Sequence, residues 1–100
     1  CVRVGVFTSH GMSVNAEFDR DITASAAREA LSCAPGVRLM DVPTPLDTAG
    51  KDPSFVGRIR GDQSAAGHRG LSFFIASDNL RKGAALNAVQ IAEILVRKYF

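Results

Sequence analysis

Two side chains near the start of the chain have types and a spacing that could serve one reaction. Arg3 and His10 are seven residues apart. The planar guanidinium of an arginine can pair both oxygens of a carboxylate at once, and it stays charged at any relevant pH. A histidine titrates near neutrality, so it can accept a proton and return it later. From residue type alone, a solvent-facing strand arginine and a structural or exposed histidine are the more frequent roles.

The backbone that must position these two residues reads as two extended segments with a break between them. Residues 1–7 alternate valines with other residues, which is typical of a strand with one buried face, and residues 13–18 form a second extended stretch. In a regular strand an odd separation puts Arg3 and His10 on opposite faces. A site shared by both therefore predicts a bulge, a turn or a strand end in the break, where Gly11 could absorb the bend.

The remaining elements predict an α+β domain with a mixed, mostly antiparallel sheet and two helices. Thr23 is a candidate N-cap for the first helix, and Pro35 with Gly36 should end it. The stretch 44–53 is rich in Pro, Gly and Asp and should be a loop. We expect helices at 22–34 and about 83–99, and strands at 37–42, 55–60 (short, at an edge of the sheet) and 71–76 (buried on both faces).

Ser77, Asp78 and Asn79 lead from the last strand into the last helix. Asp and Asn frequently form turns of this kind, which gives them a purely structural role. Arg81 and Lys82 follow, and we expect them to be surface or interdomain charges rather than phosphate ligands. The helix itself is apolar over about half of its circumference. Part of that face should meet the sheet, and part could dock onto a preceding domain.

Composition bounds the class of protein. The hydrophobic share of 46% and charged share of 22% are those of a globular chain rather than a disordered one. The net charge of +2 is spread along the sequence, so we expect neither nucleic acid nor a membrane as partner. The two cysteines lie far apart without a CxxC pair, which indicates no metal site, and a cytoplasmic location is expected. Because the chain opens on a strand-like segment without an initiator Met, we expect a piece of a longer protein.

Three segments carry a resemblance to one enzyme family. CVRVGVFTSHGMSVNAEF at the start resembles the arginine- and histidine-bearing segment of aspartate-semialdehyde dehydrogenases. VPTPLDTAGKDPSFVGRIRGD and SDNLRKGAALNAVQIAE resemble two further segments of that family, in the same order. Together they span nearly the whole chain. The chain departs from the family at the histidine, where it reads Ser-His-Gly and many relatives have Gly-His-Ser.

The resemblance implies a reaction, the NADP-dependent reductive dephosphorylation of aspartyl phosphate to aspartate semialdehyde and phosphate. This step serves the biosynthesis of lysine, threonine, methionine and diaminopimelate. By resemblance Arg3 binds the substrate α-carboxylate, His10 is the general base, and Asn79 contacts the nicotinamide cofactor. The family also implies a homo-oligomer with a fold like that of glyceraldehyde-3-phosphate dehydrogenase.

The domain organisation implied places this chain within a larger catalytic unit. Residues 1–100 would be the C-terminal part of the catalytic and dimerisation domain, and the last helix would pack toward an N-terminal dinucleotide-binding domain. The nucleophilic cysteine would lie upstream of Cys1, so this chain alone should be inactive. The absence of that nucleophile leaves an alternative, a non-catalytic α+β dimerisation or regulatory module.

Overall fold

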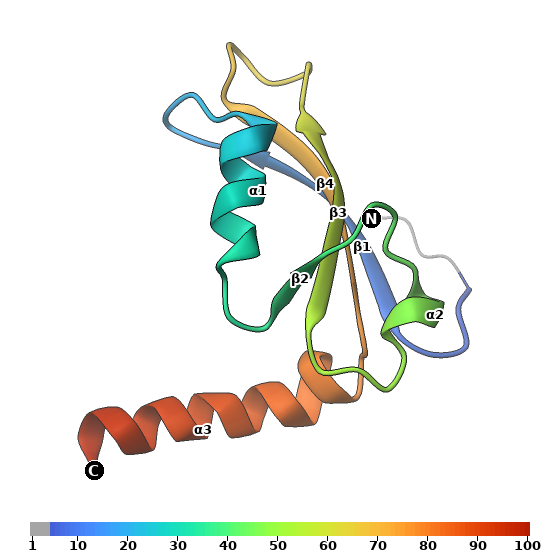
Figure 1. Cartoon of the computed structure of the whole chain (residues 1–100), viewed down its shortest axis with the longest axis vertical. Helices are drawn as coiled ribbons and strands as arrows, with labels where there is room; N and C mark the ends of the chain where they lie inside the picture. Colours follow the sequence, from blue (N-terminus) through green and yellow to red (C-terminus); the bar gives the residue numbers. More distant parts are fainter. Residues whose placement is uncertain (1–4) are drawn as a thin grey trace.

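A four-stranded mixed sheet forms the body of the computed structural model, which describes residues 5–100 (Figure 1). The strand order is β1-β4-β3-β2; β4 is antiparallel to β1 and to β3, whereas β2 runs parallel to β3. The predicted α+β class with a mostly antiparallel sheet is confirmed. The strands are β1 (His10–Glu17), β2 (Val37–Leu39), β3 (Ser54–Gly61) and β4 (Gly70–Ser77).

Several predicted strand positions need correction. Within the segment predicted as a strand at 1–7, residues 5–7 are not in a strand, and residues 1–4 lie outside the described part of the chain. The segment predicted at an edge became β3, which lies between β4 and β2. Its charges misled the prediction, because Arg58 sits at an irregularity between Gly57 and Arg60 with a φ of 56°. A bulge of this kind turns a charged side chain outward from an interior strand.

The core lies between the sheet and α1 (Ala24–Ser32). Thr23 is the N-cap as predicted, because its Oγ1 accepts a hydrogen bond from the amide of Ala26 at 3.1 Å. Gly36, with a φ of 73°, reverses the chain after the helix. One alanine of the helix packs on apolar side chains of the two central strands, and the buried cluster is Ala27, Val56, Ile59 and Leu71.

A short helix, α2 (Pro45–Thr48), interrupts the stretch predicted as a loop. Thr44 caps it through a reciprocal capping box with Asp47. Four residues are too few for a helical periodicity to show in the sequence, and only the Thr-x-x-Asp spacing signals the helix. Figure 1 shows α1 and α2 on opposite sides of the strands.

The chain ends in a helix that leads away from the sheet (Figure 1). It begins with a π-helical turn, η1 (Arg81–Ala85), and continues as α3 (Leu86–Tyr99). Measured against residues 5–100, none of the residues of α3 is buried. The expected packing of this helix against the sheet is therefore not observed. Nowhere in the described residues is a helix both long and apolar enough to cross a membrane.

Candidate functional site

His10 is the first residue of β1 and lies at one end of the sheet, beside the last residue of β4. It is paired in register with Ser77, and its side chain is exposed. Two residues beyond Ser77 stands Asn79, which is also exposed. The sheet thus brings together a histidine and a carboxamide that are distant in sequence. We call this region, where β1 begins and β4 ends, the His10 end of the sheet.

The backbone turns sharply just before His10. Ser9 has a φ of 68°, in the left-handed region that non-glycine residues rarely occupy, and β1 starts at the next residue. The predicted bend or strand end between Phe7 and Gly11 is observed, since residues 7–9 form a bend and β1 begins at His10. The residue that absorbs it is Ser9 and not Gly11, so that part of the prediction was wrong.

Two hydrogen bonds hold Ser9 in place. Its amide donates to Oδ1 of Asn79 at 3.2 Å. Its hydroxyl lies 2.9 Å from Oγ1 of Thr48, the completely buried last residue of α2. Ser9 itself is only 5% exposed. Three segments distant in sequence therefore meet around the residue that precedes His10.

Asp78 organises the same end of the sheet. Its Oδ2 accepts from the amide of Gly50 at 2.7 Å, while Oδ1 accepts from the amides of Leu80 and Arg81 at 2.8 and 3.0 Å. These three hydrogen bonds favour the ionised carboxylate, and they hold the pKa of Asp78 below its ordinary value, the bond from Gly50 most of all. The sequence had indicated the turn, but not the bond from Asp78 to the loop after α2.

The other predicted site residues have mixed outcomes. Arg3 lies outside the described residues, so the structure says nothing about its distance from His10. Arg81 forms an ion pair with Asp52, with Nε 2.6 Å from Oδ1, and Lys82 donates to Gln90 at 2.7 Å. Both cations thus have partners within the described chain, and the expectation that they are not phosphate ligands stays a prediction.

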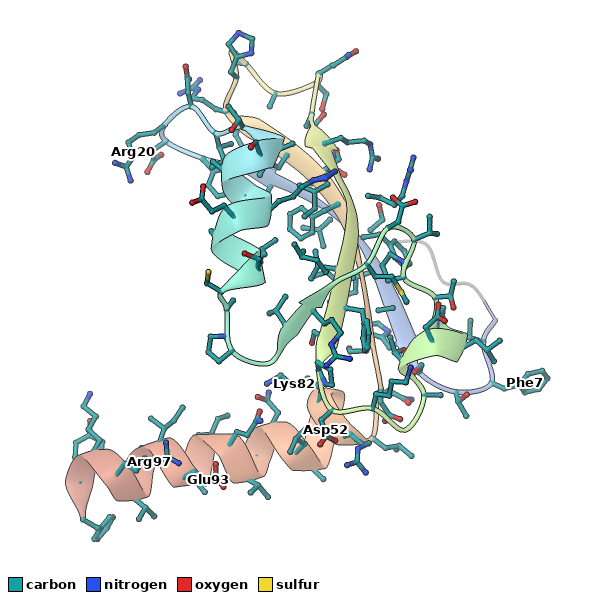
Figure 2. All side chains as sticks on the ribbon, in the orientation of Figure 1. Phe7, Arg20, Asp52, Lys82, Glu93 and Arg97 are labelled. Carbon is teal, nitrogen blue, oxygen red and sulfur yellow. The ribbon has the colours of Figure 1, made fainter. Side chains whose placement is uncertain are left out.

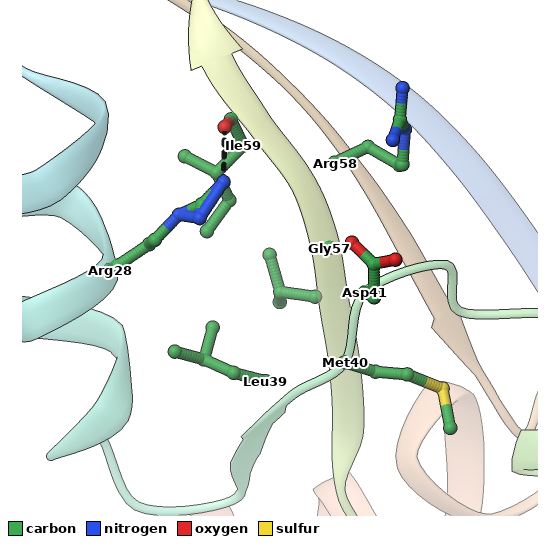
Figure 3. Close-up of a pocket in the computed structure, with 8 residues that line it drawn as sticks. Arg28, Leu39, Met40, Asp41, Gly57, Arg58 and Ile59 are labelled. Carbon is green, nitrogen blue, oxygen red and sulfur yellow. Dashed lines mark hydrogen bonds between the residues drawn. The ribbon is translucent and has the colours of Figure 1, made fainter.

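Neither of two hollows in the described part of the chain has His10 or Asn79 in its lining. The first, of about 310 Å³, lies between α1 and the strands β2 and β3 (Figure 3), where Arg28 donates to the carbonyl of Ile59 at 2.7 Å. The second, of about 500 Å³, is lined by Phe73, Phe74 and the chain around Pro43. Among residues 5–100, no group of three His, Cys, Asp or Glu side chains could hold a metal ion.

The arrangement supplies only part of a reaction site. An exposed imidazole can exchange a proton, and an exposed carboxamide can form hydrogen bonds with a polar ligand. The backbone between them is fixed by Ser9 and Asp78. The surface around them is open, so an enclosed site would need walls from residues other than those described.

The sequence and the fold match known proteins over nearly the whole chain. Residues 1–82 match the family described as semialdehyde dehydrogenase, dimerisation domain. The aspartate-semialdehyde dehydrogenase of Streptomyces akiyoshiensis is 60% identical over 95 residues, which are 95% of this chain and 28% of that protein. The enzyme of the same name from Corynebacterium glutamicum is 58% identical over 97 residues, 97% of this chain and 28% of that protein.

Solved structures of enzymes with the same name have a similar fold. The aspartate semialdehyde dehydrogenase II of Vibrio cholerae, in a complex with ASA, superposes with a TM-score of 0.86 at 44% identity, covering 95% of this chain and 29% of that one. A probable aspartate-semialdehyde dehydrogenase from Pseudomonas aeruginosa gives a TM-score of 0.82 at 35% identity, with 95% and 29% covered. The chain thus spans less than a third of the length of these relatives. It belongs to the semialdehyde dehydrogenase family, of which it represents the dimerisation domain.

Proposed function

We propose that this chain is the C-terminal part of the catalytic and dimerisation domain of an aspartate-semialdehyde dehydrogenase. The complete protein would reduce aspartyl phosphate to aspartate semialdehyde with NADPH and release phosphate, in the cytoplasm and as a homo-oligomer. The observation that carries the proposal is the match of nearly the entire chain to enzymes of that name at 58–60% identity. The nucleophilic cysteine would come from the part of the protein upstream of Cys1.

His10 is the general base in this proposal. It would accept the proton of the upstream cysteine thiol and return it later in the cycle. The geometry supports this role in two ways. The imidazole is exposed, so a substrate can reach it. Its backbone follows a residue that is held by hydrogen bonds to two other segments, which would restrict where the ring can lie.

Arg3 would bind the α-carboxylate of the substrate. One support is the sequence resemblance at the start of the chain. The other is the bend at Ser9. Two residues seven positions apart would face opposite sides of one regular strand, but the bend means that Arg3 and His10 do not share such a strand. A bidentate, charge-assisted pair of this type contributes about 1.5–3 kcal/mol.

Asn79 would contact the nicotinamide ring of NADP. Its Oδ1 accepts from the amide of Ser9, which leaves the two hydrogens of Nδ2 without an acceptor among residues 5–100. A carboxamide donor that is exposed and held at its other atom suits the carbonyl oxygen of the nicotinamide carboxamide. The cofactor would supply the hydride that reduces the acyl group to the aldehyde.

The last helix would pack on the N-terminal dinucleotide-binding domain. Apolar side chains of α3 remain open to solvent, with Leu95 47% and Val96 58% exposed. Figure 2 shows side chains projecting from both sides of α3, on a helix that extends away from the rest of the chain. Several exposed apolar residues on one helix indicate a surface that another part of the protein covers. The ring of Phe7, near His10 in sequence, is also fully exposed, and another part of the complete protein would cover it in the same way (Figure 2).

Activity of the full-length protein tests the reaction. The reverse direction is convenient: aspartate semialdehyde, phosphate and NADP should yield NADPH, whereas omission of phosphate should abolish the signal. A folded full-length protein without this activity would favour the alternative, a non-catalytic dimerisation or regulatory module.

Replacement of His10 tests its role with a matched histidine as control. His10→Ala in the full-length protein should lower kcat by about 10²- to 10⁴-fold. His68→Ala, in an exposed loop between β3 and β4, should leave kcat unchanged. Equal kcat for His10→Ala and the parent protein would refute His10 as the base.

Replacement of Arg3 separates binding from chemistry. Arg3→Lys keeps the charge but loses the fork of donors, so it should raise the KM for aspartate semialdehyde about 10-fold or more. Arg69→Lys, in the loop before β4, is the matched control and should leave KM unchanged. If both variants have the KM of the parent, Arg3 does not bind the carboxylate.

A further inference from the structure

We propose that Thr48 is a positioning residue for the reaction, because it fixes Ser9 and thereby the start of the strand that carries His10. The inference rests on the proposed role of His10 as base. Thr48 would touch neither substrate nor cofactor. It would act through one buried hydroxyl–hydroxyl contact with Ser9.

Ser9 has a conformation that its surroundings must maintain. With a φ of 68° it lies in the left-handed region, which L-amino acids with a side chain adopt only when neighbouring contacts hold them there. It is also buried, although it is polar. The next residue is His10, so any relaxation of Ser9 toward an ordinary φ would redirect the backbone that carries the imidazole.

The hydroxyl of Thr48 can make both of its contacts as hydrogen bonds only if it accepts from Ser9. The hydroxyl of Thr48 donates its single proton to the carbonyl of Pro45 at 3.1 Å, within α2. The contact of 2.9 Å between the two hydroxyls must then use the proton of Ser9. Because Thr48 is fully buried, no water can replace this acceptor, and loss of the oxygen would leave the Ser9 hydroxyl without a partner.

The sequence around Thr48 is arranged to hold that oxygen still. Pro45 begins α2, and Thr44 with Asp47 closes the capping box at its start. Thr48 is the buried residue of the helix. On the far side, Gly50 donates to Asp78, whose carboxylate also fixes the turn that bears Asn79. The two groups that bind Ser9, Thr48 and Asn79, are thus anchored to each other through Asp78.

The test uses Thr48→Val in the full-length protein, since valine keeps the shape of threonine and removes the acceptor. We expect kcat to fall about 10- to 100-fold, the size of effect that a displacement of about 1 Å of a catalytic group produces. The KM for aspartate semialdehyde and for NADP should change less than about twofold. Thr48→Ser restores the oxygen and should recover most of kcat. A purely structural role would not produce this split between kcat and KM.

A double-mutant cycle tests whether Thr48 acts on His10 through Ser9. Ser9→Ala removes the donor and keeps a side chain whose φ of 68° must be held by its surroundings, so it should lower kcat by a similar factor; adding Thr48→Val to it should cause no further loss. Effects of the two changes that multiply in full would overturn the inference, as would a Thr48→Val enzyme with the kcat of the parent. If Thr48→Val does not fold, Ser9→Ala alone decides: an unchanged kcat overturns the proposal.

His10→Ala separates this inference from the proposed function. If His10→Ala abolishes turnover and Thr48→Val leaves it intact, only the positioning role fails. If His10→Ala itself retains full turnover, the role of His10 as base fails first. In the His10→Ala background, Thr48→Val should have no effect on the residual rate, because there is no imidazole left to position.

Discussion

The ring of Phe74 lies against Gly11, the residue that follows His10. A Cβ atom built on Gly11 would stand 2.7 Å from Cζ of Phe74, closer than real atoms approach. The two residues belong to adjacent strands, where Gly11 is paired with Ala76 and Phe74 with Ser13. The missing side chain therefore gives the aromatic ring its place, and the ring in turn limits where β1 can lie relative to β4.

Gly11→Ala should destabilise the protein slightly and reduce its activity. The obstructing atom is the far end of a side chain that can turn aside, so the loss in free energy of unfolding should be about 1 kcal/mol, at the low end of overpacking effects. The shift of the strand beside His10 should also lower kcat. Chemical unfolding and steady-state kinetics of the full-length protein measure both effects.

A second substitution shows whether the loss in Gly11→Ala comes from contact with the Phe74 ring or from the lost backbone flexibility of glycine. Phe74→Leu shortens the side chain and should suppress the effect of Gly11→Ala when the two are combined. Gly61→Ala is the control, because a Cβ there would meet nothing within 4 Å. If Phe74→Leu makes the Gly11→Ala protein worse, the ring is not the cause of the loss.

Gly57→Ala should be far more damaging than Gly11→Ala. A Cβ at this position in β3 would lie 2.8 Å from the carbonyl oxygen of Asp41 and 2.5 Å from Cδ of Pro43, and backbone and proline atoms cannot turn aside. We expect a loss of about 3 kcal/mol or more in the free energy of unfolding. Thermal denaturation beside the Gly61→Ala control measures it; equal melting temperatures would contradict the close crossing of the chain over β3.

Much of the fold could be read from the sequence because the signals were local. The extended stretch at 13–18, which overlaps β1, the apolar run that became β4, the cap at Thr23 and the stop at Gly36 each depend on neighbours in sequence. Errors arose where distant contacts decide. Ser9 was not identified as the turning residue, because its conformation is held by Thr48 and Asn79, which are remote in sequence.

The candidate site divides in the same way. The chemical type of His10 and its motif were sufficient to select it. The structure adds that Asn79 bonds to the backbone before His10, and no spacing in the sequence indicates a contact between residues seventy positions apart. Arg3 and its distance from His10 stay predictions.

The ion pair between Arg81 and Asp52 should contribute little to stability. Both side chains are about half exposed, at 49% and 55%. Exposed pairs lose most of their attraction to solvent and to the ordering of two long side chains, so Asp52→Asn should cost below about 1 kcal/mol. Unfolding of the full-length protein at low and at high salt measures this. A loss well above that limit would show that Arg81 depends on Asp52 for more than a surface contact.

The exposed apolar face of α3 gives a test of the proposed domain packing. Leu95→Lys in the full-length protein should lower the free energy of unfolding by about 1.5–3 kcal/mol, the value of one buried leucine, if another domain covers the helix. Glu93→Gln, on the neighbouring polar stripe, should have almost no effect. If Leu95→Lys is equally neutral, the helix is solvated in the complete protein and the proposed packing is wrong.

Asp78 should give the protein a stability that depends on acid pH. Its carboxylate accepts three backbone hydrogen bonds, so its pKa in the folded protein is below its ordinary value of about 3.9. A lowered folded-state pKa means that the stabilisation is fully present above the unfolded-state pKa and is lost as pH falls below it. Asp78→Asn should therefore lower the melting temperature at neutral pH, and the difference from the parent should shrink as the pH falls below about 4.

The exposed Asp19 supplies the control, since Asp19→Asn should change the melting temperature little at either pH. A difference for Asp78→Asn that is the same at neutral and acid pH would show that the carboxylate charge does not contribute, and that only the shape of the side chain matters at this turn.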